Sequence, residues 1–185
     1  MAEIRLFNSA DLRSLEPASP LQKSMLLSKA HASVSGKTVF LSHSSKDDSL
    51  VPAVIALLEK HGGAVYADDF DRRLPDPPNP ATAAVLREEI RGCARLVVLA
   101  TDNSYTSRWI PWELGLGDGF HDIPPNAVLP STPLGTIPSW LQTQYFHLYP
   151  KIINMDASWW VTDPAGLARW PLQQWLTAPV VGRTP

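Results

Sequence analysis

The chain has 185 residues and a formal net charge of −2, and 18% of its residues are charged. This length suits one domain with a hydrophobic core, because domains are most often about 100 to 150 residues long. The small negative charge provides no overall basic field that would hold a nucleic acid or an acidic membrane surface. Binding to nucleic acid is therefore disfavoured.

The cysteine content and the first residues favour an intracellular protein. The single cysteine, Cys93, cannot form a disulfide within the chain. Residues 1–16 contain acids and arginines where a secretory signal peptide has an apolar run. No stretch approaches the roughly 18 apolar residues of a membrane-spanning helix. We therefore expect a soluble, cytoplasmic protein that does not contact a membrane.

The first element of the expected sheet is a strand that follows an N-terminal extension. Residues 1–36 are expected to form a peripheral N-terminal extension with a short helix over residues 21–30. Residues 37–41, KTVFL, are a short apolar run that is typical of a buried strand in a parallel sheet. This strand ends in the polar segment SHSSKDD.

A helix is expected after that polar segment. Asp47 or Asp48 is suited to be its N-cap, and Gly62 or Gly63 is suited to end it. Residues 64–68 then form a second strand. The next segment, DFDRRLPDPPNP, contains four prolines, which exclude regular structure.

The remaining elements continue the alternation of strands and helices. They are a helix from about Pro80 to Gly92, strands over residues 95–100, 126–130 and 145–149, and a last helix within residues 163–176. This order predicts an α/β fold, in which helices cover both faces of a parallel sheet. Such sheets bind ligands in the crevice beyond the carboxyl ends of their strands. Three polar loops are expected there: SHSSKDD, DDFDRRLPDPPNP and TDNSYTSRW.

The third of these loops leads into a helix that carries Glu113. Trp109 and Glu113 are four residues apart, so their side chains share one face of this helix, and Ser107 is suited to cap it. Most glutamates on helices are solvated and have no chemical role, whereas the strand-end position favours a functional one. Both interpretations stay open on this observation alone. Trp112 points about 100° away from Glu113 and is expected in the core.

Several motifs together resemble the Toll/interleukin-1 receptor (TIR) domain family. They are VFLSHSSKD, AVYADDFD, RLVVLATDNSYTSRW and WEL, in this order and spacing, over about residues 37–150. The resemblance implies a flavodoxin-like fold, a doubly wound sheet of about five parallel strands. We expect a TIR domain over residues 37–178 and a flexible tail over residues 179–185.

The resemblance also implies an activity and a catalytic residue. In TIR proteins that are enzymes, the glutamate of a W-x-x-x-E helix cleaves NAD+ between ribose and nicotinamide, and Glu113 matches it. Trp109 matches the tryptophan that lines the same pocket. The chain is similar to short bacterial TIR enzymes of antiphage defence, whose modified or cyclic ADP-ribose switches on a separate effector protein. This implies an NAD+ glycohydrolase or ADP-ribosyl cyclase that self-associates through TIR–TIR contacts and uses NAD+ as substrate, without a cofactor.

Other loop residues are weaker candidates for binding NAD+. Ser42, His43 and Ser44 are suited to bind the ribose or the diphosphate, or else they only lead into the next helix. A segment that resembles the family's BB loop, which gates the pocket and joins subunits, begins with Asp68, Asp69, Phe70 and Arg72. Alternatively, this segment is a solvated surface loop. LPDPPNP replaces the family's usual glycine, so we expect the loop to be stiffer, and its assembly contacts do not follow from the resemblance.

Other patterns carry less information. The five histidines are scattered without metal-ligand spacing, and with one cysteine this disfavours a metal site. GLGDG, residues 115–119, does not fit G-x-G-x-x-G and is expected to end a short helix. Two other functions stay open: a TIR domain that only associates with other TIR domains, and an enzyme of the nucleoside deoxyribosyltransferase type, which also uses a strand-end glutamate.

Overall fold

The computed structural model describes residues 7–8, 12–31, 36–67, 79–120, 126–132, 139, 141 and 145–179. The strands are β1 (Phe7–Asn8), β2 (Val39–Ser42), β3 (Val65–Ala67), β4 (Arg95–Ala100), β5 (Asn126–Thr132), β6 (Lys151–Met155), β7 (Ser158–Thr162) and β8 (Arg169–Pro171). The helices are α2 (Pro20–Ala30), α3 (Val51–Lys60), α4 (Pro80–Gly92), α5 (Trp109–Phe120) and α7 (Leu172–Thr177). Short 3₁₀ helices are η1 (Ser45–Asp47), η2 (Ser104–Thr106) and η3 (Tyr145–Leu148).

The strands form one sheet in the order β3-β2-β4-β5-β6-β7-β8, and β1 pairs with β5. Strands β2 to β6 are parallel to one another, whereas β7 and β8 are antiparallel additions at one side. When β2 to β6 are numbered along the chain and the short β1 is left aside, these five parallel strands follow the order 2-1-3-4-5 of the flavodoxin-like fold. The predicted fold class is therefore confirmed.

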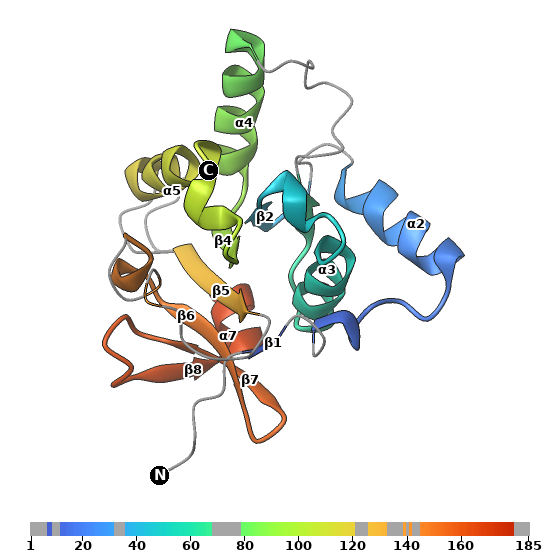
Figure 1. Cartoon of the computed structure of the whole chain (residues 1–185), viewed down its shortest axis with the longest axis vertical. Coiled ribbons are helices and arrows are strands. Elements are labelled where there is room, and N and C mark those ends of the chain that lie inside the picture. Colours follow the sequence, from blue (N-terminus) through green and yellow to red (C-terminus); the bar gives the residue numbers. More distant parts are fainter. Residues whose placement is uncertain are drawn as a thin grey trace.

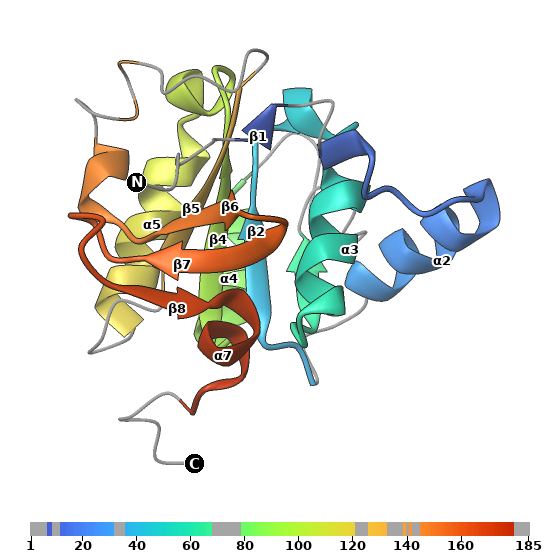
Figure 2. The same ribbon diagram turned by 90° about the horizontal axis from the view of Figure 1, so that it is seen from below.

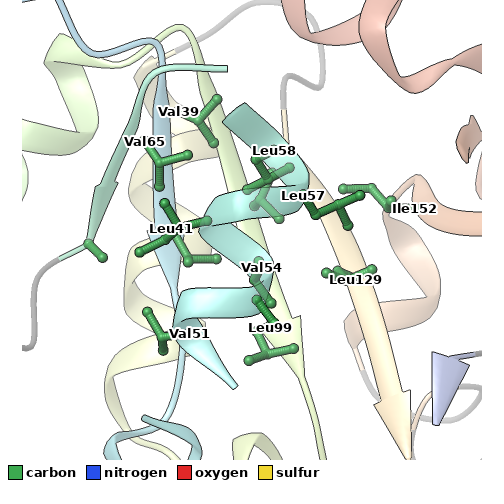
Figure 3. Packing of buried hydrophobic residues seen from close by; sticks show 14 of the residues in the cluster. Val39, Leu41, Val51, Val54, Leu57, Leu58, Val65, Leu99, Leu129 and Ile152 are labelled. Atoms are coloured by element: carbon green, nitrogen blue, oxygen red, sulfur yellow. The ribbon is translucent and has the colours of Figure 1, made fainter. Parts of the chain in front are cut away.

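Helices cover both faces of this sheet, as Figures 1 and 2 show. Helices α3 and α2 lie on one side, and α4 and α5 lie on the other. The alternation of side chains along β2 explains this: Val39 and Leu41 belong to the core cluster under α3, whereas Phe40 belongs to the cluster under α4 and α5. Figure 3 shows the packing of α3, with Val54, Leu57 and Leu58 against the sheet.

The N-terminal segment contributes to the core and to the sheet, which was not predicted. The expected short helix is present as α2, and Ser19 caps it by accepting a hydrogen bond from the backbone N–H of Gln22. Leu12 and Ala30 are completely buried. The backbone of β1 pairs with the carboxyl end of β5. The segment before residue 37 is therefore more than a peripheral extension, and the expected domain boundaries at residues 37 and 178 stay predictions.

One predicted element near the C-terminus was wrong. Residues 145–149 were expected to form a strand, but Tyr145–Leu148 is the 3₁₀ helix η3, and Phe146 within it is completely buried. The next strand begins only after Pro150, whose carbonyl accepts a hydrogen bond from Val128 N–H at 2.8 Å. The last helix was expected within residues 163–176 and is present as α7, which begins after Pro171 because residues 169–171 form β8. None of the helices in the described part of the chain is long and apolar enough to cross a membrane.

Arg95 attaches the C-terminal helix to the start of β4. Its Nε donates to the carbonyl of Trp175 at 3.0 Å, its Nη2 donates to the carbonyl of Ala178 at 2.8 Å, and its side chain lies over the Trp175 ring. We expect Arg95→Ala to lower the free energy of unfolding by about 1.5 to 3 kcal/mol, because hydrogen bonds of a charged group are lost. Urea denaturation measures this, with exposed Arg87→Ala as control. Equal losses for the two variants would contradict the anchoring role.

Candidate active site

The candidate site lies at the carboxyl ends of β2 and β4. These neighbouring strands form the switch point of the sheet, because the chain continues from β2 to β3 on one side and from β4 to β5 on the other. Ser42 is the last residue of β2 and is paired in register with Val98. Because side chains alternate along a strand, Ser42 shares the face of Phe40, which α4 and α5 cover. Ser42 thus points to the α5 side of the sheet.

Helix α5 places Glu113 opposite Ser42. The buried residues of α5 are Ile110, Glu113, Leu114 and Gly117, a spacing that puts them on one helix face against the sheet. Glu113 is 2% exposed, and the Ser42 hydroxyl donates a hydrogen bond to its Oε2. The interpretation of Glu113 as a solvated helix residue is therefore wrong. A carboxylate in the middle of an apolar stripe needs such a donor, because an unpaired buried charge is costly.

The start of α5 is fixed as the sequence predicts. The Ser107 Oγ accepts hydrogen bonds from the backbone N–H groups of Trp109 at 3.3 Å and Ile110 at 3.4 Å, and so caps the helix. Pro111 lies in the first turn, where its missing N–H has no helical partner to lose. Residues 115–119 continue the helix, which ends at Phe120, so GLGDG is not a phosphate-binding loop.

Trp109 lies one turn before Glu113 and is 37% exposed. Its ring meets the Trp112 ring edge to face, with 5.4 Å between the ring centroids and 84° between the planes. Trp112 is half-buried and packs against the core cluster under α5, which agrees with its predicted place. The contact between the two rings was not predicted. It holds Trp109 at the surface, next to the turn that carries Glu113, where a flat ligand ring has access to it.

The other two candidates after β2 lie in different surroundings from Ser42. The His43 side chain is buried, and its Nε2 lies 3.7 Å from Asp48 Oδ1. Ser44 is half-buried, and its carbonyl accepts a hydrogen bond from Asp47 N–H at 2.7 Å. Of the three residues, the structure brings Ser42 to Glu113 by a hydrogen bond. The roles of His43 and Ser44 in binding a ligand stay predictions.

Asp47 has a different role from the predicted helix cap. Helix α3 begins after Leu50, which makes no capping hydrogen bond with its side chain. Asp47 instead lies in η1 and is 4% exposed. Its carboxylate accepts hydrogen bonds from the Thr101 hydroxyl at 2.6 Å and from Asn103 Nδ2 at 2.7 Å. Sequence reasoning placed both segments in strand-end loops but did not join them through this residue.

The predicted BB-loop candidates cannot be compared with the structure. Asp68, Asp69, Phe70 and Arg72 lie outside the described residues, which end at Ala67 and resume at Asn79. Their proposed roles stay predictions. Within the part of the chain that the structure describes, no group of three or more His, Cys, Asp and Glu side chains is placed to hold a metal ion.

The far end of α5 is tied to the sheet by a second polar cluster. Asp118 accepts hydrogen bonds from Asn126 Nδ2 and from the Tyr149 hydroxyl, both at 2.6 Å. Burial and the bond to Asp118 raise the pKa of Tyr149 above its ordinary value of 10.0, and burial raises the pKa of Tyr145 to about 12. A phenol with a raised pKa in the folded state keeps its proton when the unfolded phenol loses it.

The raised pKa values of Tyr145 and Tyr149 predict that the protein loses stability in alkali. The contribution of the two phenols to the free energy of unfolding is complete below about pH 10, where both states are protonated. It falls as the pH rises from there through the folded pKa values. We expect Tyr149→Phe to be less stable at neutral pH but to lose less stability between about pH 9 and pH 11 than the wild type. Urea denaturation across this range measures the difference. The exposed Tyr105→Phe is the control, and equal slopes for wild type and Tyr149→Phe would contradict the prediction.

Comparison with known proteins agrees with this architecture. Residues 39–130 match the family model of the TIR domain. Over 116 residues the chain is 33% identical to the probable 3′ cyclic ADP-D-ribose synthase ThsB′ of Bacillus cereus (strain MSX-D12), covering 62% of this chain and 59% of that protein. Over 79 residues it is 34% identical to the putative cyclic ADP-D-ribose synthase TIR2 of Cytobacillus dafuensis, covering 41% of this chain and 21% of that protein. With its 2-1-3-4-5 sheet and this family match, the chain belongs to the Toll/interleukin-1 receptor (TIR) domain family.

Proposed function

We propose that the chain cleaves the bond between nicotinamide and ribose in NAD+, with Glu113 as the catalytic residue. The observation that carries this proposal is a buried carboxylate at the switch point of the sheet, which Ser42 holds and which the exposed Trp109 precedes by one helix turn. Ligands of doubly wound sheets bind at this place. The names of the two relatives, both synthases of cyclic ADP-D-ribose, support the same reaction.

The chemistry of this bond suits a site with one carboxylate. Most glycosidases use two carboxyl groups, because one must protonate a poor leaving oxygen. Nicotinamide in NAD+ is a cationic pyridinium, so the C–N electron pair moves to the ring nitrogen and nicotinamide leaves neutral without an acid. Positive charge then develops on the ribose. A fixed, desolvated Glu113 stabilises this charge more in the transition state than in the substrate.

Ser42 and Trp109 orient the carboxylate and the substrate in this proposal. Ser42 holds the carboxylate in one rotamer, which keeps it aimed during the reaction. The exposed face of Trp109 stacks on a flat ring of the substrate and keeps water from that side. Ser42 is therefore assigned to Glu113 rather than to the diphosphate.

The fate of the ribosyl cation decides the product. Capture by water, followed by loss of a proton, gives ADP-ribose. Capture by a nucleophilic atom of the same molecule, followed by loss of a proton, gives a cyclic product that is lighter by one water. The names of the two relatives favour the cyclic product for this chain.

Incubation of the purified chain with NAD+ tests the proposal. We expect equal amounts of free nicotinamide and of a product with the mass of cyclic ADP-ribose, measured by liquid chromatography with mass spectrometry. A product heavier by one water would show that the chain cleaves NAD+ but that water, rather than an atom of the same molecule, captures the ribosyl cation. Absence of nicotinamide over a wide range of protein concentrations, including those at which the chain self-associates, would contradict the activity.

The biological part of the proposal is a signal in bacterial antiphage defence. It rests on the similarity to short TIR enzymes, which act through a separate effector protein and self-associate through TIR–TIR contacts. Cells that carry the gene and its genomic neighbours are expected to lower phage plating, and Glu113→Gln is expected to abolish this protection. Equal protection by both forms would contradict a nucleotide signal.

The main rival is a TIR domain that only associates with other TIR domains. One observation favours it: Glu113 is 2% exposed and bonded to Ser42, as a purely structural polar pair would be. This rival predicts self-association without release of nicotinamide. It also predicts that Glu113→Gln lowers stability and leaves association with other TIR domains unchanged for the folded protein.

A further inference from the structure

Asp47 joins the two loops that flank the candidate site. It lies in η1, after β2, and both of its hydrogen-bond donors, Thr101 and Asn103, lie in the loop after β4. Asp47 is 4% exposed, so its carboxylate depends on these donors rather than on water. Hydrogen bonds to a charged acceptor are shorter and stronger than neutral ones, which agrees with the distances of 2.6 and 2.7 Å.

The loop that Asp47 holds has further internal hydrogen bonds. The Thr101 hydroxyl accepts from Asn103 N–H at 3.0 Å while it donates to Asp47. The backbone N–H of Thr101 donates to Ser104 Oγ at 3.0 Å, and Ser104 Oγ donates to the carbonyl of Leu99 at 2.9 Å. These bonds fix residues 101–104 relative to the end of β4. The carboxylate of Asp47 then fixes the same residues relative to the loop after β2.

This connection leads directly to Glu113. Ser107, three residues after Ser104, caps the helix that carries Glu113. Ser42, five residues before Asp47, donates to Glu113. Residues 42–47 therefore contact the part of the chain after β4 twice, through Asp47 at the loop and through Ser42 at the carboxylate.

We propose that Asp47 is a positioning residue, which fixes the start of α5 and thereby the place of Glu113 relative to the end of β2. The proposal rests on the proposed cleavage of NAD+ for its effect on the reaction, but its structural part is independent of any activity. A displacement of about 1 Å in a catalytic group can lower a rate about a hundredfold. Loss of the Asp47 bonds is therefore expected to lower kcat and to leave KM for NAD+ nearly unchanged.

Three substitutions separate this role from simple stabilisation. Asp47→Ala removes both acceptors and is expected to lower kcat about tenfold to a hundredfold. Asp47→Asn keeps the shape, can accept from Asn103 and can donate to the Thr101 hydroxyl oxygen, so it is expected to retain most of kcat. Arg95→Ala, which weakens the contact between the amino end of β4 and the C-terminal helix, is expected to keep kcat for the folded protein. The assays are run below the unfolding temperature of every variant.

Hydrogen exchange provides a measurement that does not need activity. In Asp47→Ala, amides of residues 101–114 are expected to exchange at least about tenfold faster, whereas amides of β6 and β7 keep their rates. Unchanged exchange over residues 101–114 would overturn the proposal, even if the wild type releases no nicotinamide. If the wild type is active, two further results would also overturn the proposal. One is a normal kcat in Asp47→Ala, and the other is a loss of kcat in Arg95→Ala as large as that in Asp47→Ala. Failure of the wild type to release nicotinamide contradicts only the proposed function.

Discussion

Glu113→Gln is expected to lower the release of nicotinamide from NAD+ by about a hundredfold to a thousandfold. Glutamine has nearly the size of glutamate, and its side-chain oxygen can still accept the hydrogen bond from Ser42. It carries no negative charge, so it cannot stabilise a ribosyl cation. The effect is therefore expected in kcat, measured at saturating NAD+, with a smaller change in KM.

Two further variants make this result specific. Glu88→Gln changes an exposed glutamate on α4 and is expected to keep full activity. Glu113→Asp keeps the charge but shortens the side chain by one methylene group, and is expected to retain more activity than glutamine. A Glu113→Gln variant that keeps more than about a tenth of the wild-type kcat would contradict the role of Glu113. Thermal unfolding of each variant shows that the comparison is made between folded proteins.

The order of the elements was predictable because the local signals are strong. Short apolar runs gave β2, β4 and β5, and Asn79 caps α4 as expected, by accepting from Ala81 N–H at 2.8 Å. The antiparallel addition of β7 and β8 was not predictable in the same way. Its Trp159 and Trp160 belong to a strand whose direction depends on pairing with β6, a contact that local patterns do not specify.

The sequence named candidate residues for the site but not all of their contacts. Spacing and position made Glu113 and Trp109 candidates, the resemblance to TIR domains implied their roles, which stay predictions, and Ser42 became a candidate from its place at the end of the first strand. The Asp47 network was missed because an aspartate before a helix is also a good N-cap, and its actual donors are 54 and 56 residues away in sequence. Such a choice between a local and a distant partner depends on the tertiary fold.

Gly117→Ala adds only one methyl group, yet it is expected to disturb the packing of α5 against the sheet. A Cβ at this position would lie 2.7 Å from Asn126 Oδ1 and 2.9 Å from Asn126 Nδ2. Asn126 is completely buried and bonded to Asp118, so it cannot easily move away. We expect the free energy of unfolding to fall by about 1 to 3 kcal/mol. Each 1 kcal/mol lowers Tm by about 2 to 4 °C in a chain of this size, which calorimetry can resolve.

The same helix contains the matched controls. A Cβ at Gly115 or Gly119 would meet nothing within 4 Å, so alanine there is expected to raise stability by up to about 1 kcal/mol through helix propensity. Equal effects at Gly115 and Gly117 would contradict the close approach of α5 to β5.

Glu113 lies one turn before Gly117 on the same buried face, so a shift of the helix at Gly117 also moves the carboxylate. Gly117→Ala is therefore expected to lower kcat in the folded protein, whereas Gly115→Ala keeps it. Asn126→Ala combined with Gly117→Ala makes room for the new methyl group, and the double variant should lose less stability than the sum of the two single losses.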